Sequence, residues 1–191
     1  VTHWIHGEHL LFEGRKMSKS AGNVVLLQDV IDREIDPLAV RFTFLENRYR
    51  SQMDLSWASL TAAHTTLKRW RRLVADGGLS LILEKDKVIE ESFFNDLDTP
   101  RALQRLRTIE KDGQINPMRK RALFLYADQI LGLDLNRTPE KIVLTAEQEN
   151  LLQSRAEARA KKDFAESDRL RSLLEASGLV IKDGPEGQSW S

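Results

Sequence analysis

Apolar residues recur at intervals of three and four along most of the chain, which is the spacing of helices that bury one face. The longest such stretch starts at Ser56 and ends at Gly77-Gly78. Its predicted buried face consists of Leu60, Ala63, Leu67, Trp70 and Val74. The pattern therefore predicts a mainly α fold.

Further helices are predicted on either side of this one, beginning with a short helix near 27–31. The next starts at Pro37 with Asp36 as its N-cap, because proline suits the first helical position. A third starts in the same way at Thr99-Pro100, and a fourth runs from about Met118 to Leu131.

Short β-prone runs lie near both ends of the chain. Thr2 to Ile5 is predicted to be a strand, and the stretch after it a hairpin and loop. Towards the other end, Thr145 and Gln148 form a capping box that opens helices up to about Ala176. A terminal hairpin is predicted from Leu179 to Trp190.

Composition narrows the possible functions. The 191 residues contain 29 Lys and Arg against 29 Asp and Glu, and no Cys. Disulfides and a thiolate zinc site made by these residues are therefore excluded. No apolar run is long enough to span a membrane, so we expect no membrane partner and a reducing compartment such as the cytoplasm. The chain begins at Val1, inside a predicted strand, and we expect it to be part of a longer protein.

The run Lys16-Met17-Ser18-Lys19-Ser20 carries the clearest chemistry. Two ammonium groups three residues apart, separated by hydroxyl residues, suit a loop that closes over a polyphosphate. They would stabilise the charge that develops on leaving pyrophosphate. For an arbitrary Lys-x-x-Lys, however, a solvated basic turn is the more common explanation.

This run matches, letter for letter, the KMSKS loop of class I aminoacyl-tRNA synthetases. The stretch from His9 to Asn23 resembles the hairpin and loop of the cysteinyl-tRNA synthetases in particular. Four further stretches are similar to motifs of that family in the same order: Asp36 to Arg41, Asn47 to Ser51, Phe94 to Ala102, and Arg159 to Trp190. The resemblance covers nearly the whole chain.

The resemblance implies an enzyme that activates cysteine with ATP and Mg and transfers it to tRNA-Cys. In this family a catalytic domain upstream of the loop supplies a H-x-G-H motif and a zinc site with two Cys, one His and one Glu. Neither is present in these 191 residues, so zinc is expected only in an N-terminal catalytic domain. We expect no metal ligands here, and no cysteine activation by this chain alone.

The resemblance also assigns roles within the loop. Lys19 is expected to make the main contact with the transition state, with Lys16 beside it as the second catalytic residue. Ser18 and Ser20 are expected to position the loop on ATP. Met17 belongs to the same ATP-binding run, although we expect it mainly to pack.

Arg48 and Arg50 are the first residues expected to bind tRNA. They open a basic run that extends to Arg72, and a second such run lies between Arg101 and Arg121. Basic runs suit a phosphate backbone, although solvated helix faces are a serious alternative.

The family's small end domain reads the anticodon, and four residues match its positions: Arg159, Phe164, Asp168 and Asp183. An aromatic side chain can stack on an unstacked base while Arg and Asp bond its edges. Two alternatives stay open, because Phe164 can belong to the core and Asp183 to a turn before Gly184.

His3, His6 and His9 recur every third residue, but this spacing does not suit a metal site on a strand, because successive side chains fall on opposite faces. We assign these histidines to structure or to the border of the active site.

The predicted organisation has four parts. Residues 1–36 form the end of a catalytic domain with the KMSKS loop and a connective segment, and residues 37–135 an antiparallel helical bundle of the anticodon-binding type. Residues 136–144 are a linker, and residues 145–191 a small α+β domain that ends in the hairpin.

Two alternative functions remain: the related ligase that joins cysteine to an amino-sugar inositol in mycothiol synthesis, and a non-catalytic module that binds tRNA. The former generally lacks the end domain that Arg159 to Trp190 resembles.

Overall fold

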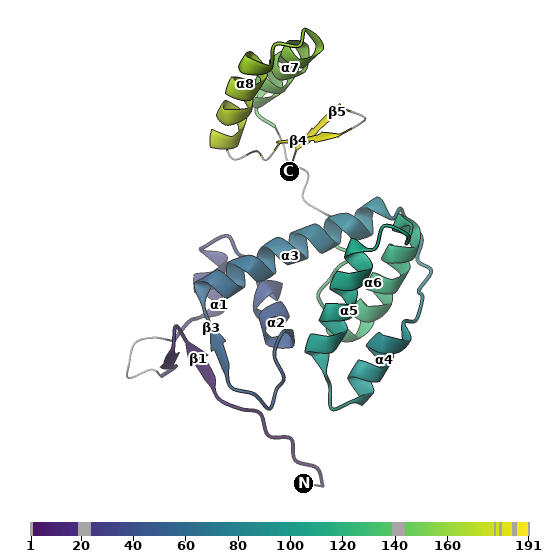
Figure 1. Ribbon diagram of the computed structural model, residues 1–191. Coiled ribbons are helices and arrows are strands. Elements are labelled where there is room, and N and C mark those ends of the chain that lie inside the picture. The colour runs from purple at the N-terminus through teal and green to yellow at the C-terminus, as the bar shows by residue number, and fades with distance from the viewer. Residues whose placement is uncertain are drawn as a thin grey trace. The chain divides into compact units, whose positions relative to one another are not determined.

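The structure is a computed structural model that describes residues 2–18, 24–138, 144–177, 179, 181–184 and 187–190. The chain folds as two compact units, Val1–Pro139 and Glu140–Ser191 (Figure 1). Most of the described chain is helical, which confirms the predicted mainly α fold. None of the described helices is both long and apolar enough to cross a membrane.

Unit 1 (Val1–Pro139) combines a small sheet with a helical bundle. Its strands are β1 (Leu10–Phe12), β2 (Arg15–Lys16) and β3 (Met53–Leu55). Its helices are α1 (Leu27–Ile31), α2 (Leu38–Leu45), α3 (Trp57–Asp76), α4 (Lys87–Phe94), α5 (Thr99–Lys111) and α6 (Pro117–Leu131). The long helix α3 runs from the sheet to the group formed by α4, α5 and α6, and it packs against both α2 and α6 (Figure 1).

An aromatic cluster holds these helices together. Trp70 of α3 is fully buried and packs edge-on against Phe42 of α2 and Phe124 of α6, with ring centroids 5.2 Å apart in each pair. Its indole N–H donates to Glu110 of α5 at 3.0 Å, so the polar atom of this buried ring is satisfied. The predicted apolar face of the long helix, including Trp70, is confirmed as part of the core.

The sheet joins segments that are distant in sequence. Strand β1 pairs antiparallel with β2 and parallel with β3, in the order β2-β1-β3. Glu13 and Gly14 connect β1 to β2 with positive φ values of 50° and 73°, as a two-residue hairpin turn requires. The hairpin was predicted, whereas the parallel strand Met53–Leu55 was not.

Several predicted boundaries are wrong in detail. Residues Thr2 to Ile5 form no strand. The N-cap of α5 is Asp98, whose side chain accepts from the Arg101 amide, so Thr99 is the first helical residue. Helix α2 begins at Leu38, one residue later than predicted. Helix α4 had no counterpart in the prediction.

Unit 2 (Glu140–Ser191) consists of two helices and a hairpin: α7 (Ala146–Ala160), α8 (Phe164–Ala176), β4 (Ile181–Gly184) and β5 (Gly187–Trp190). The Thr145 side chain accepts from the Gln148 amide at 3.2 Å and Gln148 accepts in return at 3.0 Å, which confirms the capping box. The terminal hairpin is confirmed as the antiparallel pair β4 and β5. The core of this unit consists of Leu152, Leu174, Leu179 and Ile181.

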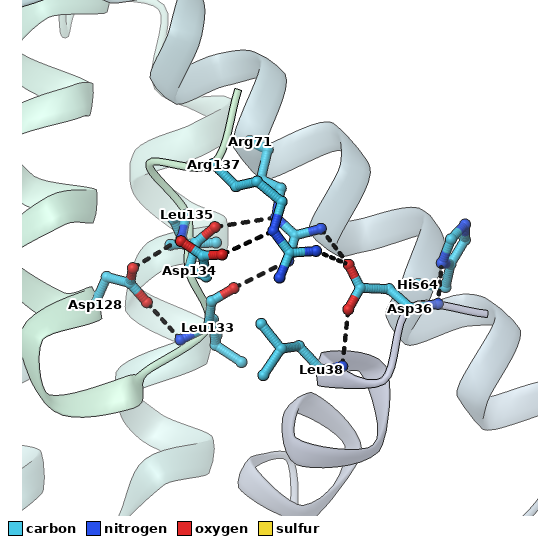
Figure 2. A network of polar contacts seen from close by, with 9 residues as sticks. All are labelled: Asp36, Leu38, His64, Arg71, Asp128, Leu133, Asp134, Leu135 and Arg137. Carbon is cyan, nitrogen blue, oxygen red and sulfur yellow. Dashed lines mark hydrogen bonds and ion pairs between the residues drawn. The ribbon is translucent and has the colours of Figure 1, made fainter. Parts of the chain in front are cut away.

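A buried ion pair between Arg71 and Asp36 connects separate segments of unit 1 (Figure 2). Arg71 of α3 is 6% exposed and donates through Nη1 to Asp36. Its other nitrogens donate to the backbone carbonyls of Leu133 and Asp134, each at 3.1 Å. Arg137 donates to the same Asp36 oxygen at 2.8 Å. One carboxylate thus binds α3 and the segment that follows α6.

Asp36 also fixes the start of α2. Its Oδ1 accepts from the Leu38 amide at 2.8 Å, and its own amide donates to His64 of α3 at 2.9 Å (Figure 2). On the opposite side of the network, Asp128 accepts from the amides of Leu133 and Leu135 at 2.7 and 2.8 Å. The carbonyls that Arg71 needs are therefore held in place by a second carboxylate.

The partners of Asp36 determine how it titrates. Burial by itself raises the pKa of this carboxyl group, but hydrogen bonds from Arg71 and Leu38 and the charges of Arg71 and Arg137 outweigh that effect. The pKa of Asp36 is consequently lowered from its ordinary value of 3.8. Its contribution to stability is present above pH 3.8 and is lost as the pH falls through the lower folded-state value.

We expect Asp36→Asn to destabilise unit 1 by roughly 3 kcal/mol at pH 7, because it leaves the buried Arg71 guanidinium without its counter-charge. Urea unfolding followed by tryptophan fluorescence measures the difference. The gap between wild type and variant should narrow as the pH falls from 3.8 through the lower folded-state pKa of Asp36, because the carboxyl group is protonated first in the unfolded chain and only then in the fold. Asp32→Asn, at an exposed carboxylate in the same segment, serves as the control. An equal loss in both variants would refute the role of the buried pair.

Candidate functional site

The β1–β2 hairpin carries the first residues of the lysine-rich run. Lys16 is the last residue of β2 and is exposed to solvent. Met17 is half-buried and packs against the core of unit 1, and Ser18 is half-buried as well. Lys19 and Ser20 lie outside the described residues, so their predicted roles stay predictions.

Two carboxylates hold the turn of this hairpin. Asp54 of β3 accepts from the Gly14 amide at 2.9 and 3.1 Å. Glu13 accepts from the amide of Trp57, the first residue of α3, at 3.0 Å. The Glu13 amide in turn donates to the Leu55 carbonyl at 3.0 Å. The turn that leads to Lys16 is therefore fixed to both β3 and α3.

The residues at this edge fit a phosphate group. Lys16 contributes an ammonium group on an exposed strand end, and Ser18 contributes a hydroxyl two residues later. Among the described residues, no three His, Cys, Asp or Glu side chains are grouped so that they could hold a metal ion. His3, His6 and His9 are all exposed.

Arg48 and Arg50 are both engaged in ion pairs within unit 1. Arg48 pairs with the buried carboxylate of Asp98. Arg50 donates to Asp96 at 2.9 Å, and the Tyr49 hydroxyl donates to the same carboxylate at 2.6 Å. The hydrogen bond to Asp96 raises the pKa of Tyr49, and that from Tyr49 lowers the pKa of Asp96. The side chains of Arg48 and Arg50 stay 48% and 66% exposed, so solvent still reaches them.

The two basic runs of the sequence find acidic partners in the fold. Most of their arginines pair with acidic residues from elsewhere in unit 1: Arg69 with Glu110, Arg105 with Asp86, Arg107 with Glu46, and Arg119 with Glu84. Arg71 and Arg121 are buried. Arg121 donates to two backbone carbonyls and to Asn136, each at 2.7 Å. Much of the positive charge in these runs is therefore used within the fold.

In unit 2 the structure brings together two of the four predicted residues. Arg159, near the end of α7, donates to the Asp183 carboxylate at 3.0 Å. Asp183 lies in β4 and pairs with Gln188 of β5, so it belongs to the strand rather than to the turn. Arg155, which the sequence analysis missed, donates to both oxygens of Asp183 at 3.0 Å.

The other two predicted residues lie on α8. Phe164 is its first residue and is 61% exposed, so the alternative of a core position is wrong. Asp168 is exposed and lies four residues later, on the same side of the helix. The pair thus offers an apolar ring and a carboxylate to solvent.

The charges around Asp183 keep it ionised. The hydrogen bond from Arg155 is the main influence that lowers its pKa, and the charges of Arg155, Arg159 and Arg171 act in the same direction. Partial burial acts against them but is the weaker influence. An ionised Asp183 shared by two arginines is the central feature of this unit.

Comparison with known proteins assigns the chain to a family. A family model described as tRNA synthetases class I (C) catalytic domain matches residues 1–65. A second, described as cysteinyl-tRNA ligase anticodon binding domain, matches residues 143–190. The chain belongs to the cysteinyl-tRNA synthetase family. Residues 16–20, Arg48 and Arg50 thus fall in the first match, and Arg159, Phe164, Asp168 and Asp183 in the second.

Curated members of the cysteinyl-tRNA synthetase family align with the whole chain. A cysteine–tRNA ligase of Gluconobacter oxydans is 34% identical over 195 residues, which cover 100% of this chain and 42% of that protein. Cysteine–tRNA ligase 1 of Burkholderia lata is 38% identical over 98% of this chain and 41% of its own length. The cysteine–tRNA ligase of Thermus thermophilus is 35% identical over 100% of this chain and 45% of its own length. The chain spans less than half the length of these relatives and corresponds to their C-terminal part.

We expect Asp54→Ala to loosen the turn before Lys16 by about 1 kcal/mol, the usual worth of one hydrogen bond, since the variant removes the acceptor of the Gly14 amide. Amide hydrogen exchange should become about fivefold faster at Gly14. Asp76→Ala, at an exposed carboxylate at the end of α3, should leave this rate unchanged. Unchanged exchange at Gly14 in Asp54→Ala would contradict the assigned support.

Proposed function

We propose that the chain is the C-terminal portion of a cysteine–tRNA ligase, which activates cysteine with ATP and transfers it to tRNA-Cys. The observation that supports this most is the alignment of the whole chain with curated enzymes of that name. The cytoplasm is the proposed compartment. The proposed parts are the end of the catalytic domain at 1–36, the helical bundle at 37–135, the linker at 136–144 and the anticodon-recognition domain at 145–191.

The lysine-rich run is proposed to bind the phosphates of ATP. Lys16 and Lys19 act on the charge that develops as pyrophosphate leaves, while Ser18 and Ser20 position the loop and Met17 anchors it. The exposed position of Lys16 and the packing of Met17 support this division of roles. Mg, when bound, neutralises part of the triphosphate charge.

The remainder of the adenylation site has to come from an N-terminal catalytic domain. These 191 residues contain no Cys and no H-x-G-H motif. Cysteine, the adenine ring and zinc are accordingly proposed to bind to that domain. The match to an anticodon binding domain favours the tRNA ligase over the mycothiol-pathway enzyme.

The tRNA is proposed to contact both units. Arg48 and Arg50 would meet the phosphate backbone, because their guanidinium groups stay accessible although paired. In unit 2, Phe164 would stack on an unstacked anticodon base, while Arg159, Asp168 and Asp183 would bond base edges. The exposure of Phe164 supports the stacking role.

We expect the chain alone to give no ATP–pyrophosphate exchange above the background without enzyme. In a chimaera with the N-terminal portion of a curated cysteine–tRNA ligase, Lys19→Ala should lower the adenylation rate by about 10²–10³-fold. Cysteine binding should weaken much less, because the ammonium group acts on charge present mainly in the transition state.

Lys111→Ala, at an exposed lysine of the bundle, is the control for that experiment. Equal losses of rate and of cysteine affinity in Lys19→Ala would speak against a transition-state role.

We also expect the chain to bind a tRNA-Cys transcript with a GCA anticodon at least about tenfold more tightly than one altered in the anticodon. Filter binding at two salt concentrations measures both affinities. Equal affinities would mean that only backbone contacts are made, and the anticodon-reading role would be lost.

A further inference from the structure

Arg155 is the most deeply buried charged residue in the described part of unit 2. Its residue exposure is 0%, although it lies on α7 only one turn before the half-exposed Arg159. Its Nη1 and Nη2 donate to the two oxygens of Asp183, each at 3.0 Å, and Nη1 also donates to Gln188 at 2.8 Å. One guanidinium therefore holds both strands of the hairpin to α7.

The contacts of Arg155 fix the orientation of Asp183 as well as its position. A bidentate pair between a guanidinium and a carboxylate is planar, so it defines the direction of both oxygens. Gln188 is itself held, because its Nε2 donates to the Leu152 carbonyl at 2.6 Å. Asp183 cannot turn without breaking this arrangement.

Arg159 depends on the same carboxylate. It donates through Nη1 to Asp183 Oδ2, the oxygen that also accepts from Arg155 Nη2. The side chains of Arg159 and Asp183 are 42% and 31% exposed, so both reach solvent while Arg155 does not. A donor and an acceptor are thus presented next to each other on a fixed support.

Stability alone does not explain a buried arginine at this position. Arg155 Nε is buried without a hydrogen-bond partner among the described residues, and an unpaired buried N–H is unfavourable. A well-packed apolar side chain would avoid that cost, since buried ion pairs are often no more stable than apolar replacements. What an apolar side chain cannot do is orient Asp183.

We propose that Arg155 is a positioning residue for base recognition: it orients Asp183, and through it Arg159, to bond the edge of an unstacked base that both donates and accepts hydrogen bonds. The inference rests on the proposed function of unit 2 in anticodon binding. Arg155 itself stays out of contact with the RNA.

The test uses the full chain and two tRNA-Cys transcripts, one with the GCA anticodon and one altered in it. Arg155→Met keeps the volume but removes the orienting contacts, so the expected tenfold preference for GCA should fall below about threefold. Arg155→Lys keeps the charge but not the planar fork, so it should restore only part of the preference. Circular dichroism melting shows whether each variant is folded. If Arg155→Met does not fold, the preference of Arg155→Lys for the GCA anticodon tests the positioning role instead.

Arg171→Met is the control for loss of charge alone, because Arg171 lies on α8 and lowers the pKa of Asp183 through its charge, while its guanidinium donates to the Ile181 carbonyl at 3.4 Å. The Arg171→Met chain should keep the full preference for the GCA anticodon. Folded Arg155 variants that keep the full preference would overturn the positioning role alone. A wild-type chain with no preference would overturn the anticodon-binding function and the positioning role with it.

Discussion

A guanidinium group removed from water needs an opposite charge beside it, and each unit of this chain is organised around one such group. In unit 1, Arg71 binds Asp36 and two backbone carbonyls, which ties α3 to the start of α2 and to the segment after α6. In unit 2, Arg155 ties α7 to both strands of the hairpin. In both cases the carboxylate partner also accepts from a second, more exposed arginine.

Pairing of arginine with carboxylates extends beyond these two buried groups. The 29 basic and 29 acidic residues balance, and many of them pair within the fold. The nucleic-acid contacts proposed above would therefore come from particular side chains that stay accessible while paired, such as Arg50 and Arg159. For such a proposal, the exposure of each side chain is a better guide than the density of basic residues in the sequence.

The features that were predictable from the sequence are those set by neighbouring residues. The capping box of Thr145 and the apolar face around Trp70 are examples, because both depend on residues within a few turns of one helix. The cap of α5 was misassigned since Asp98 and Thr99 both suit an N-cap. Asp54 and Arg155 were missed because their partners lie 40 and 28 residues away in sequence, and no local pattern marks such contacts. The spacing of Lys16 and Lys19 drew attention to the lysine-rich run, but only the resemblance to a family favoured a phosphate loop over a solvated basic turn.

The parallel pairing of β1 with β3 has a consequence for folding. The two strands are separated by the whole segment that contains α1 and α2, so their pairing closes a long loop and costs chain entropy. Glu13 and Asp54 can brace the hairpin only after that closure. Until α1 and α2 bring the two strands together, the turn that leads to Lys16 therefore lacks both of its carboxylate supports.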